Sequence, residues 1–155
     1  MARTRMSKTV SGAETDVALV SSFRDEAQLA GLYAAARLGD RPASAIVEAF
    51  RNSGYCIFAL HHDTPVGAGR AFGDEVDCAV ICDMAVHPDF QGNGLGSRIL
   101  EALMQGVRHH KRIILYVRRG KEEFYLKRGF NRMRSAMLCS FIVPAERNRE
   151  NGIIE

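Results

Sequence analysis

No stretch of the sequence approaches the roughly 18 consecutive apolar residues that a membrane-spanning helix needs. The opening run MARTRMSKTVSGAETD also lacks the apolar core of a signal peptide. These absences argue against a membrane partner and favour a cytoplasmic protein. We expect residues 1–15 to be a disordered leader, because they are small and polar and show no periodicity.

Cysteine is scarce and scattered. The chain has four cysteines and no Cys-x-x-Cys pair, and three of the four lie in apolar, strand-like runs. A reduced thiol in such a run behaves as a small hydrophobic side chain, so we predict no disulfides. Cys78, Cys82, His61 and His62 match no familiar spacing of zinc ligands, and we predict no metal site.

Charge is modest overall but unevenly distributed. The net charge is +3, yet residues 108–134 hold ten Lys or Arg residues against only Glu122 and Glu123. This basic segment fits either a solvated surface or a site that faces an anion. No stacking motif accompanies it, so we expect no nucleic-acid partner.

Hydrophobic periodicity and turn residues predict the order of the elements. The 46% apolar content is enough for one compact core but hardly for two. We predict, in order, a strand at 16–20, a helix carrying Leu29, Leu32, Tyr33 and Ala36, a helix starting at Pro42, three antiparallel strands within 55–88, a helix at 95–107, a strand at 112–117, a short helix ending at Gly129 and a strand at 135–143.

This order indicates an α/β sandwich with a mixed, mostly antiparallel sheet flanked by helices. A parallel pair of strands is expected around the helix at 95–107. We expect a single domain over residues 16–144, followed by a polar tail over residues 145–155.

Gly92, Gly94 and Gly96 lie within five residues of one another, at the start of the helix predicted at 95–107. Glycines there allow positive φ and expose backbone N–H groups at the positive end of the helix, an arrangement that binds phosphate. A P-loop ATPase is excluded because no Lys-Ser/Thr pair follows. A dinucleotide-binding fold is disfavoured because the third fingerprint glycine would fall at Ser97. A merely glycine-rich turn stays open.

The run Gln91-Gly92-Asn93-Gly94-Leu95-Gly96 matches the Q/R-x-x-G-x-G/A signature of the GCN5-related N-acetyltransferases (GNAT). MAVHPDF precedes it, and FYLKRGF follows 28 residues after Gly96. The sequence therefore resembles this family from about Asp16 to Val143. The resemblance implies a GNAT-like acyl-CoA N-acyltransferase fold, acetyl-CoA as donor, and transfer of the acetyl group to a primary amine by direct attack in a ternary complex. It implies cofactor contacts by Met84, Ala85, Val86, Gln91, Gly92, Asn93, Gly94, Leu95, Gly96 and Ser97.

The same resemblance implies that Tyr125 acts as general acid beside the thioester sulfur. A phenol, with a reference pKa of about 10, stays protonated at neutral pH and can donate to a departing thiolate. A half-buried structural tyrosine is the alternative. Arg118 and Lys121 stand where many members of the family carry Asn and Ala, which puts a contact to the pantetheine arm in doubt.

Asp83 is our candidate general base, because it lies nearest the reacting end of its strand; Asp77 and ordered water are the alternatives. Tyr33 is expected to line the acceptor site, which the first helices shape in this fold. We expect a small-molecule amine as acceptor, and a homodimer is left open. The alternative function is a non-catalytic acyl-CoA-binding sensor or partner module of the same fold.

Overall fold

The computed structural model describes residues 16–23, 25, 27–39 and 41–155. These form two units, which we describe separately: the first ends at Ile114, and the second is Leu115–Glu155. The leader expected over residues 1–15 lies outside the described residues. The domain expected over residues 16–144 includes parts of both units.

A five-stranded sheet in the order β1-β2-β3-β4-β5 is the centre of the first unit. Neighbouring strands from β1 to β4 pair antiparallel, which confirms the three antiparallel strands predicted within 55–88. The Arg112 backbone N–H donates to the Asp77 carbonyl at 2.8 Å, so β4 and β5 begin at the same end of the sheet. The strands are β1 Val17–Val20, β2 Tyr55–His61, β3 Thr64–Gly73, β4 Cys78–Val86 and β5 Arg112–Leu115.

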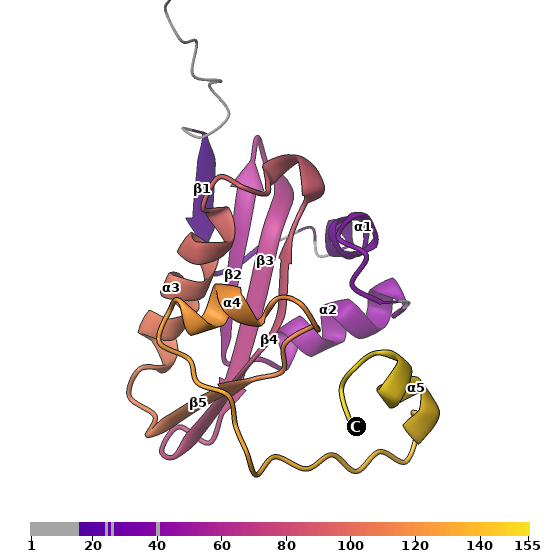
Figure 1. Ribbon diagram of the computed structural model, residues 1–155. Helices are drawn as coiled ribbons and strands as arrows, with labels where there is room; N and C mark the ends of the chain where they lie inside the picture. Colours follow the sequence, from indigo (N-terminus) through magenta and orange to yellow (C-terminus); the bar gives the residue numbers. More distant parts are fainter. Residues whose placement is uncertain (1–15, 24, 26, 40) are drawn as a thin grey trace, which may run out of the picture. The chain divides into compact units, whose positions relative to one another are not determined.

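Helices cover both faces of the sheet (Figure 1). On one face, α1 (Gln28–Ala35) and α2 (Ala43–Arg51) pack against the strands, and on the other lies α3 (Leu95–Val107). Every helix among the described residues is too short or too polar to span a bilayer. The core beneath α1 and α2 consists of Leu29, Leu32, Tyr33, Ile46, Phe50, Phe58, Ala68 and Ala85.

The apolar stripe predicted for α3 is confirmed. Leu95, Ile99, Leu100, Leu103 and Val107 are all buried, as the spacing of one helical face requires. This buried stripe packs α3 against the sheet, with the helix axis lying along the sheet. The N-terminus of α3 comes directly after the glycine-rich loop that contains Gly92 and Gly94.

Gly69 of β3 lets α3 approach the sheet closely. A Cβ atom at this position would lie 2.7 Å from Met84 Sδ and 2.8 Å from Leu103 Cδ1, closer than a Cβ atom normally comes to any nonbonded heavy atom. The bare backbone therefore sets the distance between β3 and α3.

The second unit contains α4 (Glu122–Leu126) and α5 (Ala145–Glu150). The capping role predicted for Gly129 is confirmed: its φ is +87°, its N–H donates to Leu126 O, and the Phe130 N–H donates to Tyr125 O, both at 3.2 Å. These two bonds satisfy carbonyls at the end of α4. The polar residues 145–155 include α5, with Glu146 in its first turn and Arg147 and Arg149 in its last, which suits the helix dipole.

The strand predicted at 135–143 is wrong. These residues form no strand, and Met137 and Phe141 are 99% and 98% exposed. A strand requires the backbone groups of a neighbouring strand, and the second unit, which is described throughout, offers none. The apolar and β-branched composition of the segment indicates strand propensity, but propensity does not supply a partner.

Candidate functional site

The glycine-rich loop leaves the end of β4 and enters α3. After Val86, the His87 backbone N–H donates to Val66 O at 2.8 Å, and a short 3-10 turn, η1 (Pro88–Phe90), follows. The Gln91 side chain then donates from Nε2 to Val86 O at 2.9 Å. These two bonds fix the start of the loop to the end of the sheet.

Two glycines of the loop adopt conformations that other residues rarely take. The φ angles of Gly92 and Gly94 are +83° and +80°, and Gly94 is the N-cap of α3. A Cβ built at either position meets nothing within 4 Å, so the loop is open on that side. The left-handed Gly94 ends the loop and turns the chain directly into the helix.

The first turn of α3 presents backbone donors. The first helical hydrogen bond runs from the Arg98 N–H to Gly94 O at 3.1 Å, so the N–H groups of Leu95 and Gly96 precede it and have no acceptor within the helix. Such donors, together with the helix dipole, favour an anion. The open loop and these amides fit the pyrophosphate of an acyl-CoA.

A bulge interrupts β4 just before the loop. Ala68 pairs with Ala85 and Arg70 pairs with Cys82, so that two residues of β4, Asp83 and Met84, oppose Gly69 alone. Asp83 has a φ of +53°, in the left-handed region that non-glycine residues seldom occupy. A bulge of this kind leaves a residue outside the regular ladder and re-aims the strand.

The Asp83 carboxylate is held between two guanidinium groups. Arg41 Nη2 lies 2.6 Å from Oδ1, and Arg70 Nε lies 2.6 Å from Oδ2. Arg70 also donates from Nη1 to Ser53 Oγ at 3.0 Å. Burial acts to raise the pKa of Asp83, but the hydrogen bonds and charges of the two arginines outweigh it, so the pKa lies below its usual value. Asp83 is therefore ionised at neutral pH.

Tyr33 lies beneath the bulge, in the core. Its side chain is 1% exposed, and its hydroxyl donates to the backbone carbonyl of Asp83. Burial, and then the charge of Asp83, raise the pKa of Tyr33 well above its usual value, so the phenol is neutral. A contact between Tyr33 and an acceptor would require this side chain to become more exposed.

Tyr125 lies on α4 of the second unit. Its ring meets Phe124 edge-on at 4.9 Å between centroids and Phe130 at 5.9 Å. Burial raises the pKa of Tyr125 above its usual value, and the charge of Arg128 opposes this only in part. The phenol is therefore protonated at neutral pH, which a proton donor requires.

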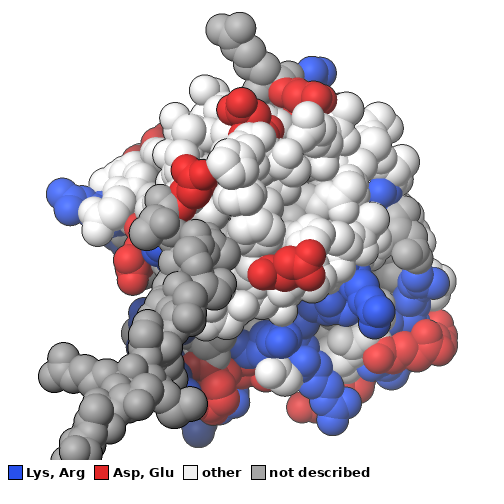
Figure 2. All heavy atoms as spheres, turned by 90° about the horizontal axis from the view of Figure 1, so that it is seen from above, with Lys and Arg blue, Asp and Glu red and all other residues white. Residues whose placement is uncertain are grey.

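Asp77 and the basic segment 108–134 have surroundings that differ from those of Asp83. Asp77 precedes β4, at the end of the strand away from the loop, and pairs with Arg112. Within the basic segment 108–134, the Arg128 guanidinium lies 3.8 Å from the centre of the Phe124 ring. Figure 2 shows Lys and Arg side chains with Asp and Glu side chains among them on the face that it presents.

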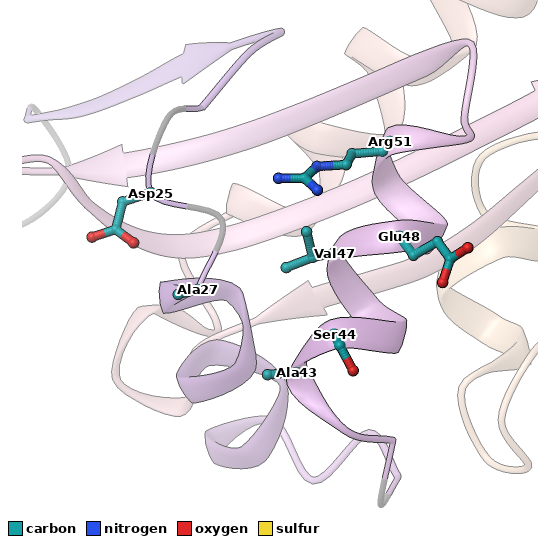
Figure 3. A pocket seen from close by; sticks show the side chains of 7 residues that line it. All are labelled: Asp25, Ala27, Ala43, Ser44, Val47, Glu48 and Arg51. Carbon is teal, nitrogen blue, oxygen red and sulfur yellow. The ribbon is translucent and has the colours of Figure 1, made fainter.

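A groove lies between the start of α1 and the exposed side of α2 (Figure 3). None of the residues that we predict to bind cofactor or acceptor lines it. The side chains around it are short or charged. They are Asp25, Ala27, Ala43, Ser44, Val47, Glu48 and Arg51.

A model of the acetyltransferase (GNAT) family matches residues 19–130. The chain belongs to the GNAT acetyltransferase family. This confirms the resemblance drawn from the motifs, and the matched range includes the bulge, the loop and Tyr125. The mixed, mostly antiparallel sheet is that of GNAT folds: an acetyltransferase of the GNAT family from Streptococcus pneumoniae superposes with a TM-score of 0.69 at 20% identity, over 81% of this chain and 98% of that one.

Two GNAT relatives are similar in sequence. An uncharacterized N-acetyltransferase, ycf52-like, of Prochlorococcus marinus is 30% identical over 107 residues, which are 65% of this chain and 59% of that protein. GCN5-related N-acetyltransferase 1, chloroplastic, of Arabidopsis thaliana is 33% identical over 107 residues, 66% of this chain and 54% of that protein. The chain thus spans less than two thirds of the length of either relative.

Sequence reasoning missed the arginine pair around Asp83. Arg41 precedes α2 and Arg70 lies in β3, far from each other in the chain, and no local motif joins them. Cys82-Asp83 in the middle of an apolar strand was the one available signal, because a carboxylate at a half-buried position calls for cationic partners.

Proposed function

We propose that this protein transfers the acetyl group of acetyl-CoA to a primary amine of a small molecule, by direct attack in a ternary complex. The proposal rests on three features that follow one another along the chain. They are the bulge in β4, the left-handed glycines of the loop and the backbone amides that begin α3. Membership of the GNAT family supports the same donor and reaction class.

The cofactor contacts divide between the loop and the strand. The loop Gln91–Gly96 and Ser97 at the helix start would hold the pyrophosphate through backbone N–H groups. Met84 in the bulge, with Ala85 and Val86 after it, would pair with the pantetheine arm through the backbone and orient the acetyl carbonyl. Acetyl-CoA, when bound, supplies a thioester whose carbonyl carbon accepts the amine.

Proton transfer is assigned to Tyr125 and to water. Tyr125 is protonated at neutral pH, so it can hydrogen-bond to the departing thiolate and pass it a proton, and the phenolate left behind takes a proton from water. Asp83 is a weak proton acceptor while two arginines hold it. We therefore assign Asp83, with Tyr33 beneath it, to fixing the bulge, and ordered water to taking the proton of the amine.

A thiol-release assay tests the proposal. The purified protein is mixed with acetyl-CoA and a panel of aralkylamines, polyamines, amino sugars and a lysine peptide, and free CoA thiol is followed. Amine-dependent thiol release with a small amine supports the proposal. Stabilisation by CoA without thiol release for any amine would instead favour the non-catalytic acyl-CoA-binding module.

The cytoplasmic location remains a prediction from the sequence. The Arabidopsis relative is named as chloroplastic.

A further inference from the structure

A second polar cluster lies in the first unit, where α3 ends beside the turn between β3 and β4 (Figure 1). Glu75 belongs to that turn, and His109 and His110 follow Arg108, the C-cap of α3. One ligand atom from each residue lies within 4.8 Å of the other two. The 13 residues of α3, about 20 Å of helix, separate this cluster from the glycine-rich loop. We propose that Glu75, His109 and His110 bind a zinc ion.

His110 is the reason to expect a ligand rather than a solvated charge cluster. The residue is 6% exposed, and its Nδ1 lies 2.9 Å from Val107 O. That carbonyl can only accept, so Nδ1 carries a proton, and in the neutral ring Nε2 then carries the lone pair. Nε2 is buried and has no hydrogen-bond partner among the described residues. A buried acceptor without a partner is costly, and a metal ion satisfies it.

The backbone around His110 Nε2 is kept bare. A Cβ atom on Gly73, the last residue of β3, would lie 2.6 Å from Nε2. Any side chain at position 73 would therefore displace the imidazole. Glycine at this point leaves His110 in place between the strand and the helix end.

Glu75 and His109 supply the accessible side of the site. His109 Nε2 lies 3.4 Å from Glu75 Oε2, and the two side chains are 46% and 60% exposed. The Tyr55 hydroxyl donates to Glu75 Oε2 at 2.7 Å, which orients the carboxylate. A cation can reach the site from this side and keep a water as its fourth ligand.

The donor set selects the metal. Two imidazole nitrogens and one carboxylate oxygen are ligands that zinc accepts in tetrahedral geometry with a fourth position open. Bound zinc would tie the end of α3 to the β3–β4 turn and, through Tyr55, to the start of β2. It would thus stabilise the first unit and take no part in acetyl transfer. The site departs from the sequence-based expectation of no metal, which considered only the cysteines with His61 and His62.

Another group of possible metal ligands, Asp16, His61 and His62, provides a comparison with the Glu75 cluster. His62 Nε2 lies 3.1 Å from Asp16 Oδ2, and both side chains are more than half exposed. Within the part of the chain that the structure describes, no buried atom without a partner belongs to this group, so water can solvate its members.

Metal binding can be tested without any acetyl transfer. The full chain is stripped with a chelator, dialysed and titrated with ZnCl2 while its melting temperature is followed. We expect one zinc per chain and a rise in Tm of about 5–10 °C at a hundredfold excess over Kd. Co²⁺, added instead, should give the visible absorption of a tetrahedral site.

Three variants assign the ligands. Glu75→Gln and His109→Gln change exposed side chains, so they should fold, keep the Tm of the stripped wild type and lose the zinc-dependent rise. His62→Gln, the matched control, should keep the rise. The proposal is overturned if zinc does not change the Tm of the wild-type chain. It is also overturned if the zinc-dependent rise in Tm persists in each of the single variants Glu75→Gln and His109→Gln.

Discussion

The hydroxyl of Tyr33 in α1 donates a hydrogen bond to the backbone carbonyl of Asp83, fifty residues later in β4. The acceptor belongs to a residue whose φ is +53°, so a buried side chain supports a conformation that the strand alone would not keep. Helix α1 thereby positions the bulge at the start of the candidate cofactor strand, residues 84–86 of β4.

Tyr33→Phe should lower both the free energy of unfolding and the catalytic efficiency. The change keeps the ring in the core and removes the one hydroxyl that reaches Asp83 O. Loss of this bond should lower the free energy of unfolding by about 0.5–1.5 kcal/mol, measured by urea denaturation, and reduce kcat/KM. Tyr116→Phe, at a tyrosine that is 73% exposed, is the control and should change neither quantity. Unchanged stability in Tyr33→Phe would show that the bond contributes nothing.

Gly94→Asp should weaken CoA binding while the protein stays folded. Position 94 is left-handed and open, which aspartate tolerates, and an acidic residue at a helix N-terminus is favourable for the helix. The added charge would face the pyrophosphate and cost about 1–4 kcal/mol, roughly a fivefold to thousandfold loss of affinity by calorimetry. Gly94→Asn has nearly the same shape without the charge and should lose much less. Equal losses in the two variants would mean that shape, not charge, is responsible.

Tyr125→Phe tests the general acid. The ring and its packing against Phe124 and Phe130 remain, and only the proton donor is lost. We expect kcat to fall by about 10²- to 10⁴-fold, with CoA affinity and Tm little changed. Because the pKa of Tyr125 is raised, the wild-type rate should decline only at a pH above about 10, where the phenol ionises. Wild-type kcat in the folded variant, with chemistry rate-limiting, would remove Tyr125 from the mechanism.

Asp83→Asn separates a positioning residue from a general base. Asparagine keeps the shape but leaves Arg41 and Arg70 without their shared carboxylate. As a positioning residue, Asp83 should affect kcat and KM while the pH dependence of kcat/KM keeps its shape. Loss of the acidic limb of that profile in the variant would instead identify Asp83 as the base.

Asp74 should make the fold sensitive to acid. Its Oδ1 accepts the backbone N–H groups of Val76, Asp77 and Cys78, which lowers its pKa to about 2. The folded state thus holds the ionised form more strongly than the unfolded chain, whose Asp pKa is about 3.9. The stabilisation is complete above the unfolded pKa and is lost as the pH falls toward 2. Thermal melts should show a smaller loss of Tm between pH 5 and pH 2 in Asp74→Ala than in the wild type, and equal losses would refute this role.

Local patterns predicted the elements whose stability is local. The stripe of α3, the hairpins of β2 to β4 and the cap at Gly129 follow from spacing and from residue types that act within a few positions. The segment 135–143 shows the limit of such reasoning, because a strand depends on a partner that its own residues do not specify.

The site was predictable only where it is contiguous. The loop from Gln91 to Ser97 could be found as a motif because neighbouring amides bind together. The bulge at Asp83 and its two arginines arise from contacts between residues far apart in the chain. The buried, unpartnered Nε2 of His110 depends on how the helix end packs on the strand, and periodicity reports neither.

The space at Gly69, which Met84 and Leu103 leave too small for a Cβ atom, has a consequence for selection experiments. Any larger residue at position 69 must push against a residue of the candidate cofactor strand on one side and against α3 on the other. The candidate cofactor strand and α3 would both shift. The rate of acetyl transfer would then fall even though Gly69 touches no reactant. A mutational scan scored by activity should therefore mark position 69 as intolerant as the motif glycines, and only a parallel scan scored by abundance would reveal that its requirement is steric.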